Sequence, residues 1–115
     1  MKPLIIYVSG PYSEDTEEQI LFNVNQAIFY GIEIMRKGHN VIVPHLSHYM
    51  EKQAQEFAGG FSWDRWMAQD LALLEKCDAF FFVGPSKGAC VELERAKELG
   101  LPIYYSLDEV EEVGE

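Results

Sequence analysis

The sequence predicts a single α/β domain: a three-layer sandwich, Rossmann-like or flavodoxin-like, with a mostly parallel sheet of four to five strands. Short apolar runs alternate along the chain with longer segments of helical periodicity. The runs are apolar throughout rather than at every second residue, which is typical of parallel strands covered on both faces. The length of 115 residues and the apolar content of 48% suffice for one packed core, so residues 1–115 are predicted as one domain.

The first half of the chain predicts two strands around a long helix. Residues 4–8 are β-branched and aromatic and run into a Ser-Gly-Pro loop, which indicates a buried strand. Residues 17–37 carry apolar side chains at helical spacing and end in Lys-Gly, a helix stop. Residues 40–43 form the second strand, which a proline ends. Residues 44–60 have mixed polarity, and the glycine pair that closes them breaks any helix across residues 49–57.

The second half predicts two more helix and strand pairs. A helix over residues 62–76 begins at a serine, a natural N-cap. Residues 79–83 form the third strand, and residues 84–88 form the loop that leaves it. The next helix begins near the last glycine of that loop and ends at a Gly-Leu-Pro stop before a strand at residues 103–105. The acidic end, residues 108–115, is expected to be a short terminal helix or a frayed tail.

The order of the strands decides where a ligand would bind. If the order is 2-1-3-4, the topological switch point lies between the first and third strands. Open sheets of this kind bind ligands there, outside the carboxyl ends of the strands. The loops at residues 9–13 and 84–88 are therefore the places to look for a site.

The amino-acid composition limits the kinds of partner that the protein is expected to bind. Nineteen acidic and nine basic side chains leave a formal charge of -10, which argues against binding to nucleic-acid polymers or an anionic membrane face. The apolar runs are too short to span a bilayer, and the first residues lack a secretory h-region, so we expect a cytoplasmic protein. Cys77 and Cys90 lack C-x-x-C spacing and are expected to be reduced core thiols.

Two acids lie on helix faces that otherwise bury apolar side chains. Asp70 follows Met67 by three residues and precedes Leu74 by four, so burial is expected to raise its carboxyl pKa. Glu92 flanks the apolar stripe of the next helix, near its start, and is expected to project towards the switch point.

Each acid also has a structural interpretation: Asp70 would cap a neighbouring loop, and Glu92 would be a favourable charge near a helix N-terminus. The pair is more informative than either acid. Two carboxyl groups in one crevice are what glycoside cleavage uses, one for the leaving group and one for the cationic sugar carbon.

The loop at residues 84–89 brings Ser86, Lys87 and two small residues, Gly88 and Ala89, to a helix N-terminus. Free backbone N–H groups and the helix dipole favour an anion such as phosphate there. The Walker A order and the G-x-G-x-x-G pattern are both missing, so nucleoside triphosphate and dinucleotide binding are poorly supported. An ordinary strand-to-helix turn is the alternative interpretation.

The histidines and large aromatic residues carry weaker signals. His45 and His48 are three residues apart without clustered acids, so we expect an exposed loop pair and no metal site. Trp63, Trp66 and Tyr49 are expected in the core. One of them could instead line a nucleobase pocket, because such pockets are mostly apolar and aromatic.

Three stretches resemble the nucleoside 2-deoxyribosyltransferase superfamily. They are Tyr7 to Tyr12 after the first strand, Asp70-Leu71 ahead of the Cys77-Asp78-Ala79 strand entry, and Ser86 to Ala96. The resemblance is closest to the small 2'-deoxynucleoside 5'-monophosphate N-glycosidase branch and to related uncharacterised bacterial and phage proteins. It covers most of the chain, and the S-x-G-x-x-x-E stretch is its specific part.

The resemblance implies a role for individual residues. Glu92 matches the nucleophile that forms a covalent glycosyl-enzyme, and Asp70 matches the acid that assists departure of the base. Ser86 matches a phosphate-contacting hydroxyl, and Tyr12 falls where an aromatic residue meets the substrate. With Glu92, Asp70 and Tyr12 as the catalytic set, the predicted substrate-binding residues are Ser9, Gly10, Pro11, His45, Ser86, Lys87, Gly88 and Ala89.

The expected ligand is a nucleoside or nucleotide, with no cofactor and no metal, and the resemblance implies a homodimer or higher homo-oligomer. Hydrolysis and transfer to a second base both remain open. Lys87 favours a monophosphate substrate. Residues 45–61 do not match the family, so the base and the 2'-hydroxyl preference are open. Two other functions remain: a phosphoribohydrolase of the cytokinin-activating type, although its P-G-G-x-G-T run is missing, and a non-catalytic nucleotide-binding module.

Overall fold

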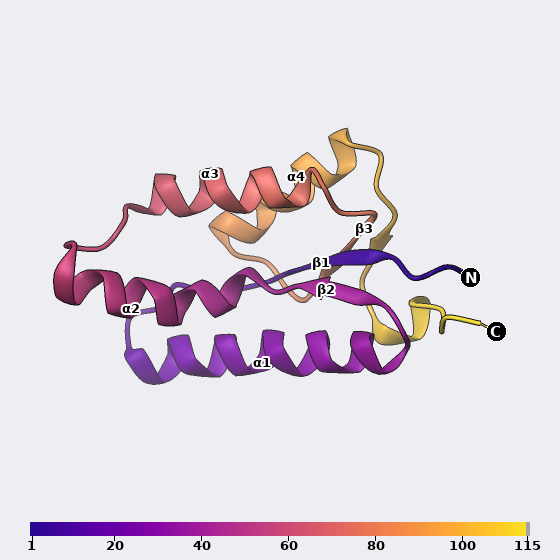
Figure 1. The fold of residues 1–115 in the computed structure, drawn as a ribbon, viewed down its shortest axis with the longest axis horizontal. Helices are drawn as coiled ribbons and strands as arrows, with labels where there is room; N and C mark the ends of the chain where they lie inside the picture. The colour runs from indigo at the N-terminus through magenta and orange to yellow at the C-terminus, as the bar shows by residue number, and fades with distance from the viewer. Residues whose placement is uncertain (115) are drawn as a thin grey trace.

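Four parallel strands form one sheet in the order β2-β1-β3-β4, so the switch point lies between β1 and β3 (Figure 1). The computed structural model describes residues 1–114. It confirms the predicted α/β class and the mostly parallel sheet, which is here entirely parallel. The strands are β1 (Ile5–Ser9), β2 (Asn40–Ile42), β3 (Ala79–Phe82) and β4 (Ile103–Tyr104).

Helices cover both faces of this sheet and complete the three layers (Figure 1). α1 packs on β1 and β2 from one side, while α4 packs on β1 and β3 with α3 beside it. α2 continues from β2 past the end of the sheet, over its carboxyl edge (Figure 1). The helices are α1 (Glu17–Arg36), α2 (Ser47–Phe57), α3 (Trp63–Leu74) and α4 (Lys87–Glu98), and the short 3-10 turns are η1 (Pro44–Leu46) and η2 (Leu107–Glu109).

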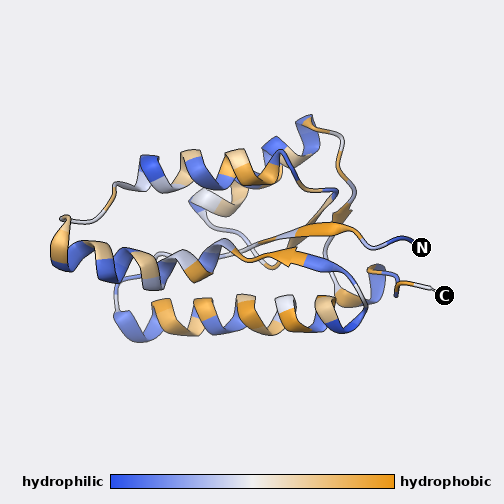
Figure 2. Ribbon diagram, in the orientation of Figure 1, coloured by the Kyte–Doolittle hydropathy of each residue, from blue (hydrophilic) through white to orange (hydrophobic). Residues whose placement is uncertain are grey.

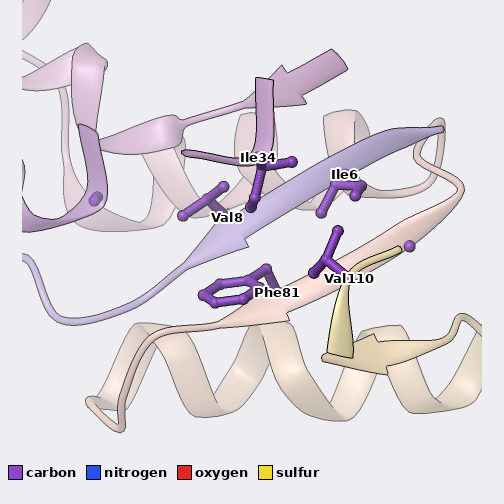
Figure 3. Packing of buried hydrophobic residues seen from close by; sticks show 7 residues of the cluster. Ile6, Val8, Ile34, Phe81 and Val110 are labelled. Atoms are coloured by element: carbon purple, nitrogen blue, oxygen red, sulfur yellow. The ribbon is translucent and has the colours of Figure 1, made fainter. Parts of the chain in front are cut away.

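Two apolar clusters hold the layers together, one on each face of the sheet. Successive side chains of a strand point to opposite faces. Ile6 and Val8 therefore pack with Ile34 of α1 and with Phe81, as Figure 3 shows. Tyr7 lies between them in the chain and belongs to the cluster under α3 and α4. The strands are mostly hydrophobic, apart from the polar start of β2, whereas the helices alternate between polar and apolar residues (Figure 2).

Serine caps start the two helices beside the switch point. The Ser62 hydroxyl accepts the Arg65 N–H at 3.1 Å, and the Ser86 hydroxyl accepts the Ala89 N–H at 3.1 Å. Both bonds satisfy amides that the helix itself leaves unpaired. The predicted N-cap at Ser62 is confirmed.

The segment after β2 is more ordered than the sequence indicated. The proline that ends β2 begins the η1 turn, and α2 follows at Ser47, two residues before the predicted start. α2 ends near Gly59 and Gly60, as predicted, and both glycines have positive φ, 78° and 79°. Such angles favour glycine, so the pair separates α2 from α3.

The C-terminal segment is docked on the α1 side of the sheet rather than frayed. Val110 is buried in the same cluster as Ile6 (Figure 3). The His39 ring lies between Leu4 and Glu111: its Nδ1 accepts the Leu4 N–H, and its Nε2 donates to the Glu111 carbonyl at 2.6 Å. The prediction of a terminal helix is met only by the short turn η2, and Glu115 lies outside the described residues.

The two cysteines lie in different surroundings, one inside the protein and one at its surface. Cys77 is buried, but Cys90 is exposed on α4, so the prediction of two core thiols is wrong for Cys90. Its position two residues before buried Glu92 turns it to the outer side of the helix.

Within residues 1–114, no helix is both long and apolar enough to cross a bilayer.

Candidate active site

A cavity of about 460 Å³ opens at the carboxyl ends of β1, β2 and β3. Its walls come from the loop after β1, the η1 turn with α2, the α3 helix, and the start of α4. This is the edge of the sheet at which parallel α/β proteins bind ligands. Of the predicted site residues, those that line the cavity are Gly10, Tyr12, His45, Asp70, Ser86, Lys87, Gly88, Ala89 and Glu92.

Glu92 is a buried carboxyl group in the cavity wall. Its side chain is 6% exposed. Its carboxylate accepts two hydrogen bonds from β1, from the Tyr7 hydroxyl at 2.5 Å and from the Ser9 hydroxyl at 2.6 Å. Tyr7 and Ser9 are two residues apart in a strand, so both side chains point to the face that α4 covers. The predicted contact residue Ser9 thus bonds Glu92 rather than lining the cavity.

The surroundings of Glu92 act on its charge in opposite directions. Burial raises the pKa of its carboxyl group, while the hydrogen bonds from Ser9 and Tyr7 lower it. The pKa of Tyr7 is raised, first by burial and then by the charge of Glu92, so Tyr7 stays protonated and donates. Two hydroxyl donors aimed at one carboxyl group stabilise its ionised form.

Asp70, on α3, lines the same cavity, and its carboxyl pKa is raised as well. Burial raises its pKa to about 7, and the charge of Glu92 adds to the effect. Burial thus raises the pKa of both carboxyl groups, and at Glu92 the hydrogen bonds from Ser9 and Tyr7 oppose the rise. Neighbouring carboxyl groups whose environments separate their pKa values are suited to different steps of acid–base chemistry.

The loop after β3 has both a structural and a ligand-facing part. The Ser86 hydroxyl caps α4, which is the ordinary strand-to-helix role that the sequence left open. Residues 86–89 nevertheless line the cavity, so the positive end of the helix dipole faces it. The Lys87 ammonium lies 4.8 Å from the ring centre of Trp63, in a cation–π contact.

Both histidines after β2 are buried, so the prediction of an exposed pair is wrong. His45 is 6% exposed and His48 is 4% exposed, because η1 and α2 fold back against the loop after β1. The His45 Nε2 lies 3.2 Å and 3.1 Å from the carbonyl oxygens of Gly10 and Pro11. Since carbonyls only accept, Nε2 carries the proton, and burial lowers the His45 pKa.

Trp63, Trp66 and Tyr49 are not core residues. Trp63 and Tyr49 are well exposed, which corrects the prediction for both. Trp63 and Trp66 line the cavity, and the Trp66 indole N–H donates to Glu51 at 2.9 Å. The same Glu51 oxygen accepts the Phe61 N–H at 2.8 Å, so Glu51 ties α2 to the start of α3. Short-range periodicity could not separate a core tryptophan from one on a cavity wall.

Tyr7 and Glu51 are among the site residues that the sequence does not predict. The sequence predicts Tyr7 only as a strand residue, and in the structure its hydroxyl also donates to Glu92. A signal existed: a buried tyrosine needs a partner for its hydroxyl, and Ser9 lies two residues on, on the same strand face. Tyr12, predicted to be catalytic, lines the cavity, but its hydroxyl bonds His48 at 2.7 Å rather than either carboxyl group.

Nothing in the described chain suggests a bound metal. Residues 1–114 contain no cluster of three or more potential histidine, cysteine or carboxylate ligands. The groups that the site offers are two carboxyl groups, the hydroxyls that bond Glu92, one helix N-terminus and an aromatic wall.

Residues 4–106, nearly the whole chain, match the family described as a domain of unknown function (DUF7768). No curated protein matches the chain.

Proposed function

The chain belongs to the DUF7768 family, and from its pair of carboxyl groups we propose that it is an N-glycosidase or deoxyribosyltransferase acting on a nucleoside or nucleoside 5'-monophosphate. One observation carries the proposal. A buried carboxylate held by two hydroxyl donors shares a cavity with a carboxyl group whose pKa is about 7. This is the pairing that glycoside cleavage requires.

In the first step, ionised Glu92 attacks C1' of the sugar while the bond between C1' and the base nitrogen breaks. Asp70 gives its proton to the departing base, so the base leaves neutral and Asp70 becomes a carboxylate. The product is a glycosyl ester of Glu92. The hydroxyls of Tyr7 and Ser9 orient the nucleophile before the attack.

In the second step, the ionised Asp70 takes a proton from the group that attacks C1', and the bond to Glu92 breaks. Water as the acceptor gives the free sugar or sugar phosphate. A second base as the acceptor gives a new nucleoside. Both outcomes use the same residues, so the acceptor admitted to the cavity decides between hydrolysis and transfer.

The cavity walls support a nucleotide-sized ligand. The start of α4 offers an anion its dipole and the nearby Lys87, which supports a 5'-phosphate at this end. Lys87 would have to leave the Trp63 ring to reach it. Trp63, Trp66 and Met67 supply an apolar wall of the kind that holds a nucleobase.

The exposed side of α1 supports a homo-oligomer. Exposed apolar side chains gather on this helix, at Phe22, Phe29, Ile32 and Met35. Contiguous apolar surface on a small protein is typical of an interface. A second copy of the chain packed on α1 would cover it.

The test is release of free base from a panel of nucleosides and monophosphates, followed by chromatography. We expect release by the native protein and at least ~10²-fold less by Glu92→Gln, because the nucleophile is lost. Glu94→Gln is the matched control: it removes an exposed carboxylate from the same helix, and within residues 1–114 Glu94 forms an ion pair with Lys97 alone.

Equal release by the native and Glu92→Gln proteins would contradict the proposal. Release only from ribonucleotides would favour the phosphoribohydrolase, and tight binding without release would favour a non-catalytic module. Transfer would show as a new nucleoside when a second base is added. A 2'-fluoro substrate should leave a glycosyl adduct on Glu92 that mass spectrometry can locate.

A further inference from the structure

A line of polar side chains runs from the surface to the cavity through a buried histidine. The Tyr12 hydroxyl lies 2.7 Å from His48 Nδ1, and His48 Nε2 lies 3.3 Å from a carboxylate oxygen of Glu17. The same Glu17 oxygen accepts from the Lys52 ammonium at 2.8 Å. These residues come from three segments, the loop after β1, the first turn of α1, and α2. Neither carboxyl group of the proposed reaction belongs to this line.

The Glu17 carboxylate favours one position for the proton of the His48 ring. A carboxylate only accepts, so the neutral ring places its N–H at Nε2, towards Glu17. The contact is electrostatic rather than a well-aligned hydrogen bond, since Nε2 has no hydrogen-bond partner among the described residues. Nδ1 is then an acceptor, and the single hydroxyl proton of Tyr12 is donated to it.

We infer that Tyr12 determines ligand specificity by accepting a hydrogen bond from the ligand, with His48 and Glu17 as positioning residues. The inference rests on the proposed function, because it names a ligand contact of that same site. Tyr12 lines the cavity, and its oxygen keeps a free lone pair after its proton is committed to His48. The matching ligand group is a hydrogen-bond donor: a pentose hydroxyl or a base N–H.

Because the Tyr12 hydroxyl can only accept a hydrogen bond from the ligand, an ionised phosphate is disfavoured at this wall. Phosphate oxygens accept, and Tyr12 has no proton left to give them. Tyr12 also stays protonated, since burial and the charges of Glu17 and Glu51 raise its pKa. A nucleotide would therefore bind with its phosphate at the start of α4 and a donor group at Tyr12.

The line of side chains is not needed to hold the loop in place. The buried amide of Asn23 donates to the Tyr12 carbonyl at 3.2 Å, and His45 holds the carbonyls of Gly10 and Pro11. Removal of the Tyr12 hydroxyl should therefore leave the loop folded. What it removes is an oriented acceptor on the cavity wall.

The first test is the position of the proton on His48, read from the ¹⁵N chemical shifts of its ring nitrogens. We expect a protonated Nε2 and an unprotonated Nδ1 in the native protein. Glu17→Gln should mix the two tautomers, because an amide both donates and accepts. The neighbouring Glu18→Gln should not. A proton on Nδ1 in the native protein would overturn the inference, whatever ligand binds.

The second test measures binding to Glu92→Gln protein, which should not turn over. The ligands are a 2'-deoxynucleoside 5'-monophosphate and analogues that lack one donor each, at the sugar 3'-hydroxyl or at a base amino group. Adding Tyr12→Phe should lower the affinity for the parent ligand about three- to tenfold and leave the affinity for one analogue unchanged. That analogue identifies the donor. Tyr49→Phe, at an exposed tyrosine outside the cavity, is the control.

If Tyr12→Phe lowered the affinity equally for the parent ligand and every analogue, or lowered none of these affinities, the inference would be overturned while the proposed function stands. If Glu92→Gln protein binds none of these nucleotides, the proposed function fails, and the ligand contact of Tyr12 fails with it. The tautomer measurement separates the two cases, because it needs no ligand.

Discussion

Replacing Tyr7 with phenylalanine should destabilise the protein in a way that depends on pH. The substitution keeps the ring, which stacks 5.8 Å from Phe80, and removes only the hydroxyl that donates to Glu92. Glu92 is buried, so its carboxylate cannot replace that donor fully with water. The lost free energy is that of a hydrogen bond to a charged group, about 1.5–3 kcal/mol.

The sign of the pH dependence follows from the folded pKa of Glu92. Burial already raises this pKa above its ordinary value of 4.5, and loss of the Tyr7 donor raises it further. A group with a raised folded pKa contributes stability at low pH that is lost as the pH rises through that pKa. The stability gap between native and Tyr7→Phe protein should therefore widen from acidic to alkaline pH. At the acidic end it should approach the cost of a neutral hydrogen bond, about 0.5–1.5 kcal/mol.

Urea unfolding followed by tryptophan fluorescence at pH 5.5 and pH 8.5 measures this gap. Both proteins should carry Asp70→Asn, since Asp70 titrates near pH 7 beside Glu92. Tyr30→Phe is the control: this tyrosine packs on Phe81, and its hydroxyl has no hydrogen bond within residues 1–114. The same loss at both pH values, or a loss no larger than in the control, would refute the reasoning.

Three further predictions follow from single contacts. Asp70→Asn should be more stable than native protein above pH 7, because the raised pKa of Asp70 makes the native protein lose stability as the pH rises from the ordinary value of 3.8 to about 7. Urea unfolding at pH 4 and pH 8 checks this difference. The same substitution should slow base release about 10²-fold or more in the base assay. Gly10→Ala should lower the free energy of unfolding in urea by about 1–3 kcal/mol, because its new Cβ would lie 2.8 Å from the Cβ of Val83. Gly84→Ala is the control and should lower it less, because its new Cβ would lie 3.7 Å from its nearest neighbour. Phe29→Asp should turn an oligomer into a monomer in sedimentation velocity; an unchanged sedimentation coefficient would remove α1 as the interface.

The fold was predictable because its signals are local. Continuous apolar runs indicate strands covered on both faces, and glycines, prolines and N-cap serines mark the ends of the elements. Ser62 is an example, since its capping bond needs only the next three residues. Once the strands are parallel and joined by helices, short right-handed connections leave few topologies. Boundaries were less certain, as α2 shows by starting two residues early.

The site was only half predictable. Asp70 and Glu92 stood out because an acid on an apolar helix face conflicts with local patterning, and such conflicts occur at functional sites. The partners of Glu92 and the buried His48 gave no such conflict. A tyrosine inside an apolar strand and a histidine in a polar segment both fit their local surroundings. Nothing in the neighbourhood of His48 in the chain indicates that Tyr12, 36 residues away, would supply its partner.

The sequence by itself determined the class of the fold, the caps and stops of its helices, and the two acids that break the apolar pattern. Only the tertiary structure decided that Tyr7 and Ser9 hold Glu92, that both histidines are buried, and that Asp70 shares the cavity with Glu92. The physical reason is the range of the interactions. Backbone propensity and periodicity act over a few residues, whereas hydrogen bonding and desolvation depend on groups that the parallel sheet brings together from up to 85 residues apart.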